Sequence, residues 1–316
     1  MSCTEKTKNA YRRRGRWLAK RAKAELCVDQ LNFDQFAAWF LFHHDSWRPS
    51  TIRQYRAAIV ALVHDQIASR QLDKHQGEQI IAKLRGRIGD DGRQAAPRPT
   101  KTSSRPRKRK CAPPRLVERL RQRLCHFHTK AAVIAHKIAA NGPEIGVRGC
   151  EWDSIEVYDG FCRVRNAKST NGRANGTLRV IVVPPRDLTR ELLATANEIA
   201  TAIQAGIPWE NMQRRVNYYL RRASRDIGLK QPISLSTLRH IAIGRWKVAF
   251  SPAEVAALAG HASNATAVCH YGRSRSGRKW PPVSVKPYSH SLERVRDHFR
   301  SYDQRKITAP VISPMI

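Results

Sequence analysis

The chain has 316 residues, and its 58 lysines and arginines against 25 aspartates and glutamates give a formal net charge of +33. So large a positive excess indicates a polyanionic partner and says little about the fold. No apolar run approaches the roughly 18 residues that a membrane helix needs, and the basic first 24 residues lack the apolar core of a signal peptide. We therefore expect a soluble, cytoplasmic protein without a membrane partner.

Residues 1–87 are predicted to form a basic arm followed by a small helical bundle. The arm covers residues 1–25, where arginines and lysines are frequent. From Asn32 onward apolar residues recur at helical spacing, with Asn32 and Ser50 as expected N-caps of two helices and a third helix over 77–87. We expect this bundle to bind DNA, although its apolar faces alone would equally explain a bundle that only packs.

Residues 88–114 change in character, because five prolines lie in and around the basic run Arg105–Lys110. This composition cannot build a core, so it predicts a flexible linker between two domains. The linker is expected to lie along a nucleic-acid backbone. A solvated hinge or a nuclear-localisation run would have the same composition.

The second domain is predicted to span residues 115–316 and to combine helices with a small β-sheet. Helices are expected over 116–140, 188–205 and 210–227, with a new turn opening at Pro143-Glu144. The stretch 161–183 is predicted as a strand pair that turns at Asn171-Gly172 and places Cys162 and Val164 on one side.

Two further helices are predicted near the end of this domain. Ser251 to Glu254 forms a capping box with a proline at the first helical position, and Gly260 ends that helix, which places His261 just beyond it. Ser291–Tyr302 is expected to be a final amphipathic helix. The fold class is therefore mainly α with a small β-sheet, an N-terminal helical domain preceding an α+β domain.

Five residues of the second domain form a candidate catalytic set. They are Arg148, Lys168, Arg239, His261 and Tyr271. Breaking a phosphodiester without a metal requires positive charge at the non-bridging oxygens, a proton for the leaving oxygen and an aligned nucleophile. The arginines can bind the phosphate, the lysine can donate the proton, and the histidine can move protons or bond the phosphate. The tyrosine can then attack to form a phosphotyrosyl link.

No cofactor and no metal are expected at this site. The seven cysteines are scattered without a C-x-x-C pair, so neither a zinc ribbon nor a disulfide framework is indicated. Taken singly, each candidate would more often be a solvated base, a half-buried tyrosine or a histidine beside a helix end. Their combination in this order favours the catalytic interpretation.

The surrounding motifs resemble those of the tyrosine recombinase (phage integrase) family, over about the last two-thirds of the chain. Gly146–Glu151 resembles the family's Gly-Leu-Arg-x-x-Glu turn, and Lys168 is similar to its hairpin lysine. Ser236–His240 is similar to the His-x-Leu-Arg-His box, and Leu258–His261 resembles the Leu-Gly-His box. Tyr271 then falls at the place of the nucleophile. The N-terminal bundle resembles the family's core-binding domain in architecture only.

The resemblance implies a site-specific recombinase or integrase of a mobile genetic element, such as a phage or a transposon. Such an enzyme cuts and rejoins double-stranded DNA through a 3′-phosphotyrosyl intermediate, as a DNA-bound tetramer and without a cofactor. An accessory DNA-binding protein is a further candidate partner. The final helix could pack either on a neighbouring subunit or on its own domain.

Two departures from the family pattern bear on the rate and the detailed geometry of the reaction more than on its class. Ser236 stands where the family has a histidine, so that histidine's role is either missing or passes to His240, and both are further candidates for the site. The spacing from His261 to Tyr271 is ten, one more than the family pattern. The alternatives are a DNA-binding architectural or regulatory protein with weak or no cleavage, and a type IB topoisomerase.

Overall fold

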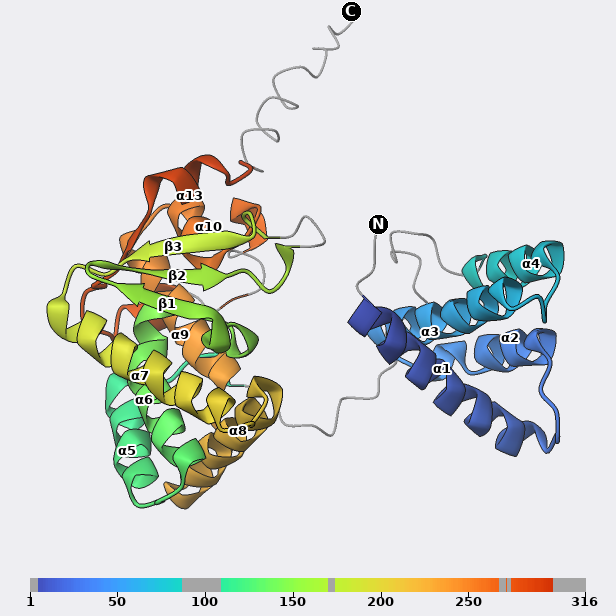
Figure 1. The fold of residues 1–316 in the computed structure, drawn as a ribbon, viewed down its shortest axis with the longest axis horizontal. Coiled ribbons are helices and arrows are strands. Elements are labelled where there is room, and N and C mark those ends of the chain that lie inside the picture. The colour runs from blue at the N-terminus through green and yellow to red at the C-terminus, as the bar shows by residue number, and fades with distance from the viewer. Residues whose placement is uncertain (1–4, 87–108, 170–173, 267–270, 272–273, 298–316) are drawn as a thin grey trace, which may run out of the picture. The chain divides into compact units, whose positions relative to one another are not determined.

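The computed structural model describes residues 5–86, 109–169, 174–266, 271 and 274–297. The chain divides into two compact units, residues 1–105 and 106–316. The described residues are mostly helical and contain one small antiparallel sheet (Figure 1), so the predicted fold class is confirmed. Of the predicted linker 88–114, only residues 109–114 lie among those described.

The first unit is a helical bundle. Its elements are α1 (Glu5–Leu26), α2 (Phe33–Phe42), the 3-10 helix η1 (His44–Ser46), α3 (Pro49–Ala68) and α4 (Lys74–Arg85). The expected basic arm is thus mostly the helix α1, which packs against α3. Leu18 and Ala22 are fully buried, and Arg12 donates to Asp65 of α3 at 2.8 Å through Nε. The segment has so many charged residues that its apolar residues at helical spacing were not recognised as the buried face of a helix.

The helix starts of this unit follow local rules, with two corrections to the prediction. Asn32 caps α2, because its side chain accepts a bond from the Gln35 N–H at 2.8 Å. Helix α3 begins with Pro49 at its first position and Arg48 as its N-cap, so Ser50 is not the cap. Helix α4 begins at Lys74, earlier than predicted, because Asp73 caps it.

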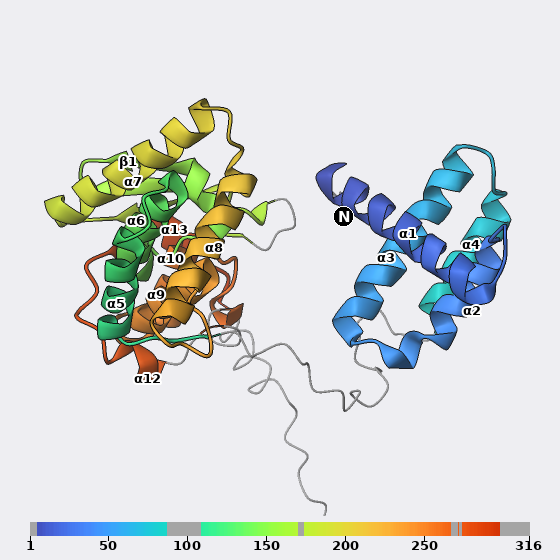
Figure 2. The same cartoon turned by 90° about the horizontal axis from the view of Figure 1, so that it is seen from below.

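The second unit places a sheet beside a group of helices. Its elements are α5 (Pro114–Cys125), α6 (Lys130–Ile145), η2 (Gly149–Ser154), β1 (Ile155–Tyr158), β2 (Phe161–Arg165), β3 (Leu178–Val182), α7 (Arg186–Gln204), α8 (Trp209–Asp226), α9 (Leu235–Ala249), α10 (Pro252–Ala259), α12 (Ser274–Gly277), β4 (Lys286–Pro287) and α13 (Ser289–Glu293). Helix α7 lies beside β1, and α10 lies at the other edge beside β3 and β4 (Figure 1). Figure 2 shows α9 among the other helices of this unit, in contact with α6 and α10.

The sheet is antiparallel with the order β1-β2-β3-β4. Cys162 pairs with Ile181 and Val164 with Arg179 across β2 and β3, and the side chains of Cys162 and Val164 are buried, as predicted. The predicted turn at Asn171-Gly172 lies outside the described residues. Strands β1 and β4 were not predicted, since each is short and depends on its neighbours in the sheet.

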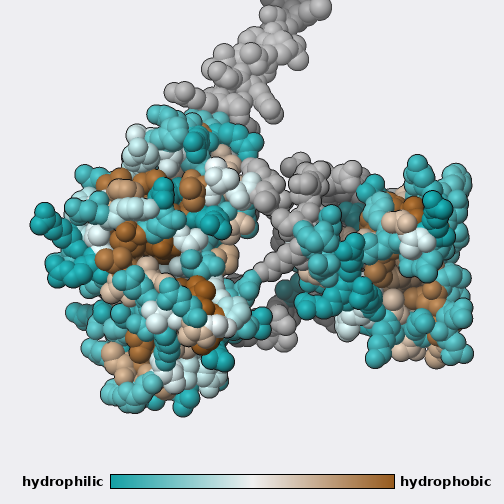
Figure 3. Space-filling view, viewed as in Figure 1, coloured by the Kyte–Doolittle hydropathy of each residue, from teal (hydrophilic) through white to brown (hydrophobic). Residues whose placement is uncertain are grey.

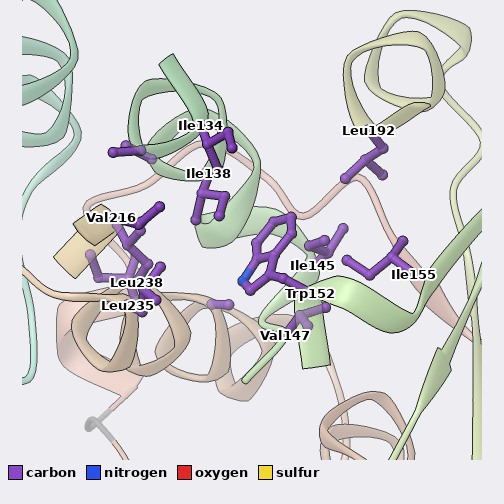
Figure 4. Packing of buried hydrophobic residues seen from close by; sticks show 14 of the residues in the cluster. Ile134, Ile138, Ile145, Val147, Trp152, Ile155, Leu192, Val216, Leu235 and Leu238 are labelled. Carbon is purple, nitrogen blue, oxygen red and sulfur yellow. The ribbon is translucent and has the colours of Figure 1, made fainter. Parts of the chain in front are cut away.

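The core of the second unit joins α6, η2 and α9. Trp152 of η2 is 2% exposed and lies among Ile145, Val147 and Ile155 (Figure 4). This packing anchors the segment between α6 and β1, which contains Arg148.

On the face shown in Figure 3, hydrophilic residues cover most of the surface. No helix in the described parts of the chain is long and apolar enough to cross a membrane.

Two predicted elements of the second domain are wrong in their bounds. Pro143 does not open a new turn, because it lies inside α6, which continues to Ile145. The end of α6 has tertiary partners, since Arg245 donates to the Pro143 carbonyl at 2.9 Å and Trp246 to that of Glu144 at 3.1 Å. The expected helix 291–302 is the shorter α13, which ends at Glu293, while residues 298–316 lie outside the described part.

Candidate active site

The ends of three helices place the candidate residues. Helix α6 ends at Gly146, whose φ of +54° turns the chain toward Arg148, the N-cap of η2. Helix α9 begins with a capping box formed by Ser234 and Thr237, and Arg239 follows on it. A capping box also begins α10, which ends at Gly260 with φ +65°, and His261 comes directly after it.

Arg239 is the central group of the site and is 4% exposed. Its guanidinium donates to the carbonyl oxygens of Gly146 at 2.5 Å and Ala259 at 2.8 Å, which tie α9 to the ends of α6 and α10. On its other side Nε donates to the Tyr271 hydroxyl oxygen at 3.3 Å, and Nη2 lies 3.2 Å from His261 Nε2. Burial, and then the charge of Arg148, lower the pKa of Arg239 to about 10, so it stays charged at neutral pH.

Tyr271 lies half-buried between this arginine and two histidines. Its ring centroid is 5.0 Å from that of His240 and 5.2 Å from that of His261. Burial alone would raise the pKa of the phenol, but the charge and hydrogen bond of Arg239, with the charges of Arg148 and Lys168, lower it overall. The site therefore stabilises the phenolate, the nucleophilic form of a tyrosine, relative to that of a tyrosine in water.

His261 is 2% exposed and neutral. Burial lowers its pKa to about 2, and the charges of Arg239 and Arg148 act in the same direction. Its Nδ1 has no hydrogen-bond partner among the described residues. In this form the imidazole has one N–H donor and one acceptor nitrogen, and it lacks the acidic second proton of an imidazolium.

Arg148 is fixed by a carboxylate three residues further on. Glu151 Oε1 accepts from Arg148 Nη1 at 2.5 Å, and its Oε2 accepts from the Arg148 backbone N–H at 3.0 Å. Burial alone would raise the pKa of Glu151, but the charges of Arg179 and Arg148 lower it far below its usual range. The carboxylate therefore stays ionised and holds the Arg148 side chain, which is 13% exposed, in place.

The remaining candidates surround this group. Lys168 is exposed in the turn after β2, and the N–H of the preceding Ala167 donates to Glu151 at 3.0 Å. Ser236 is exposed on the first turn of α9 and is three and four residues from Arg239 and His240, hence on their side of the helix. The longer His261–Tyr271 spacing does not separate the two rings.

Sequence reasoning missed three groups that support the site. Glu151 was recognised only as the last residue of the Gly146–Glu151 motif, and Arg179 and Asn166 were not recognised at all. Along β3 the side chains of Leu178 and Val180 are more exposed, whereas those of Arg179 and Ile181 are buried on the inner face of the sheet. An arginine on the apolar face of a predicted strand was therefore the available signal.

The positive charge of the site comes mainly from buried arginines. The described residues contain no group of three or more His, Cys, Asp or Glu side chains that could hold a metal ion. Three guanidinium groups (Arg148, Arg179 and Arg239) act on one buried carboxylate and one neutral histidine, and two of them (Arg148 and Arg239) act on the phenol. Such a net positive cluster with a nucleophile suits an anionic ester.

Comparison with known proteins agrees with this fold. No protein-family model and no curated protein sequence matches the chain. A solved structure of lambda integrase, a tetramer bound to a Holliday junction, matches with a TM-score of 0.50 and 14% identity over 90% of this chain and 76% of that one. XerA recombinase matches with a TM-score of 0.35 and 14% identity over 98% of this chain and 99% of that one. The chain therefore has the fold of a tyrosine recombinase.

Proposed function

We propose that the protein is a tyrosine site-specific recombinase that cuts and rejoins double-stranded DNA through a 3′-phosphotyrosyl intermediate. The observation that carries this proposal is the contact of one buried arginine, Arg239, with both Tyr271 and His261. Arg148 adds its charge to the same group. These are the groups that a metal-independent attack on a phosphodiester needs.

In the proposed reaction a scissile phosphate binds beside Arg148 and Arg239 and takes over the bonds that Arg239 now makes to Tyr271 and His261. The Tyr271 oxygen attacks phosphorus, and the bond from phosphorus to the 5′ oxygen breaks. The phenol loses its proton to His240, whose ring centroid lies 5.0 Å from that of Tyr271, against 5.2 Å for His261, while Lys168 protonates the leaving 5′ oxygen. The reverse steps, with another 5′ hydroxyl, rejoin the strand.

Exposed basic residues on both units support DNA as the substrate. Helix α1 exposes Arg13, Arg16, Trp17 and Lys20, which fits a core-binding role for the first unit. Helix α8 exposes Arg214, Arg215, Arg221, Arg222 and Arg225 in the catalytic unit. Binding is expected to weaken steeply with salt, because each neutralised phosphate releases counterions.

The wider setting follows from the same proposal. We propose that the enzyme is cytoplasmic, is encoded by a mobile genetic element and acts as a tetramer on DNA, with an accessory DNA-binding protein as a candidate partner. The lambda integrase structure is itself a tetramer on a Holliday junction. For this chain the assembly is tested by measuring the mass of its complex with DNA.

Covalent trapping tests the proposal. Wild type and Tyr271→Phe are incubated with nicked DNA from the flanks of the gene, with and without a chelator, and separated on a denaturing gel. A slow protein–DNA band that needs Tyr271 and survives the chelator supports the proposal. Tight, salt-sensitive binding without any band would favour a non-cleaving regulator, and relaxation of plasmid without recombinants would favour a topoisomerase.

A further inference from the structure

A buried arginine outside the recombinase motifs lies directly behind the candidate site. Arg179 is on β3, opposite Val164 of β2, and its side chain is fully buried. A guanidinium stays charged at any working pH. Burying one costs several kcal/mol unless it is paired and hydrogen-bonded. The cost of burying Arg179 must therefore be offset by the groups that it bonds.

The first partner of Arg179 is Glu151. Arg179 Nη2 donates to Glu151 Oε2 at 2.8 Å. The same carboxylate accepts from the side chain and backbone of Arg148 and from the backbone N–H of Ala167, next to Lys168. One carboxylate thus joins β3, the start of η2 and the turn after β2.

The second partner is Asn166, which Arg179 bonds through Nη1. Asn166 Nδ2 donates to the carbonyl oxygens of Asn175 and Gly176, at 3.1 Å each. The end of α10 packs onto this pair so closely that a Cβ on Gly260 would lie 2.2 Å from Asn166 Oδ1 and 3.0 Å from Arg179 Nη1. His261 follows directly, so Arg179 also supports the segment that contains it.

We propose that Arg179 is a positioning residue for the recombinase reaction. Through Glu151 it holds Arg148 and the turn of Lys168, and through Asn166 it supports the backbone that presents His261. The inference rests on the proposed function, since it concerns how fast the candidate site cleaves DNA. Arg179 is too deeply buried to bind DNA, so it acts only through these partners.

A simpler explanation is that Arg179 stabilises the sheet and nothing more. The two explanations differ in what the loss of Arg179 changes. A sheet-stabilising residue would affect unfolding without affecting the cleavage rate of the protein that remains folded. A positioning residue affects the rate at full folding, because a displacement of about 1 Å in a catalytic group can cost on the order of 100-fold.

Three variants separate these explanations. Arg179→Met removes both bonds, while Arg179→Lys keeps the charge but replaces the planar fork with a single donor group, and it serves if the methionine variant does not fold. Arg163→Met is the matched control, because Arg163 is an ion-paired arginine on the neighbouring strand β2 with its partner Glu156 on the exposed side of the sheet.

Two measurements are made on each folded variant. The first is the single-turnover rate of covalent complex formation together with DNA affinity. We expect Arg179→Met to lower the rate about 100-fold with unchanged affinity, Arg179→Lys to recover part of the rate, and Arg163→Met to match wild type. An unchanged rate in both Arg179 variants would overturn the inference.

The second measurement is amide hydrogen exchange by mass spectrometry, which needs no cleavage. In Arg179→Lys we expect faster exchange at residues 146–151, 164–169 and 258–262, with the helices α5 and α8 unaffected. Exchange that is unchanged at these three segments, or raised uniformly, would overturn the inference. If wild type itself formed no covalent complex, the proposed function would fail, while the exchange data would still decide whether Arg179 holds these segments.

Discussion

The Nε of Arg239 donates to the phenolic oxygen of Tyr271 at 3.3 Å, across an interval of 32 residues in the chain. The same guanidinium bonds the carbonyl oxygens at the ends of α6 and α10. Arg239 is therefore at once a structural tie between three helices and the group that lowers the pKa of the nucleophile.

Replacing Arg239 by lysine should impair both roles. Lysine keeps the charge but cannot reach both carbonyl oxygens and Tyr271 at once, so we expect the single-turnover cleavage rate to fall by about 100-fold or more. The unfolding free energy should fall by about 1–3 kcal/mol, because buried acceptors lose their donors. Arg245→Lys is the control, since Arg245 is also buried on α9 but bonds Pro143, Pro281 and Pro282. An equal loss of rate in both variants would contradict this assignment.

The neutral state of His261 predicts a pH dependence of stability. Unfolded His261 takes up a proton near pH 6.5, whereas the folded group has a pKa of about 2. Its contribution is thus fully present above pH 6.5 and is lost as pH falls. Between pH 7 and pH 5, wild type should lose about 2 kcal/mol more unfolding free energy than His261→Asn. Urea unfolding measures this, and parallel losses in the two proteins would show that His261 is not buried neutral.

Replacing Ser236 by histidine is expected to raise the cleavage rate rather than to lower it. It is exposed on the side of α9 that carries Arg239 and His240, at the place of the family's histidine. A positioned acid or base contributes about 100-fold or more to a proton transfer, so we expect Ser236→His to raise the cleavage rate at least about tenfold. Ser236→Ala, which adds no titratable group, should leave the rate unchanged. If Ser236→His cleaves no faster than Ser236→Ala, a second histidine adds nothing to the proton transfer that His240 performs, and the prediction is wrong.

Gly260 should tolerate alanine poorly, for two reasons that a control separates. Its φ is +65°, and an added Cβ would lie 2.2 Å from Asn166. Gly206 has a φ of +79° and open space around it. We expect Gly206→Ala to cost about 1–2 kcal/mol in unfolding free energy from backbone strain alone, and Gly260→Ala about 1–3 kcal/mol more from overpacking. Equal costs by urea unfolding would mean that Asn166 moves away freely.

Local patterns predicted the parts of the fold that local chemistry decides. The caps at Asn32 and Ser251 and the strand pair after Phe161 depend on a few adjacent residues. Helix α1 was missed because its charge hid Leu18 and Ala22, which are buried only against other helices. The full length of α6 depends on bonds from Arg245 and Trp246, about a hundred residues away.

The candidate site shows the same division. Arg148, Arg239 and His261 could be found because each lies in a short motif, and Tyr271 because it follows the last of them. The Gly146–Glu151 motif also contains Glu151, three residues after Arg148 and so on the same side of a helical turn. Arg179 lies in no motif. Its relation to Glu151 spans 28 residues and exists only once β3 has paired with β2. A short motif therefore identifies the groups that meet the substrate more readily than the buried groups that hold them.

The most direct test of the account is to identify the residue that carries the DNA. Wild type is trapped on a nicked substrate and digested with trypsin, and the DNA-linked peptide is sequenced by mass spectrometry. We predict that the peptide is 248–273 and that the 3′ phosphate is attached to Tyr271. Attachment to another residue, or covalent complexes that persist in Tyr271→Phe, would contradict the assignment of Tyr271 as the nucleophile.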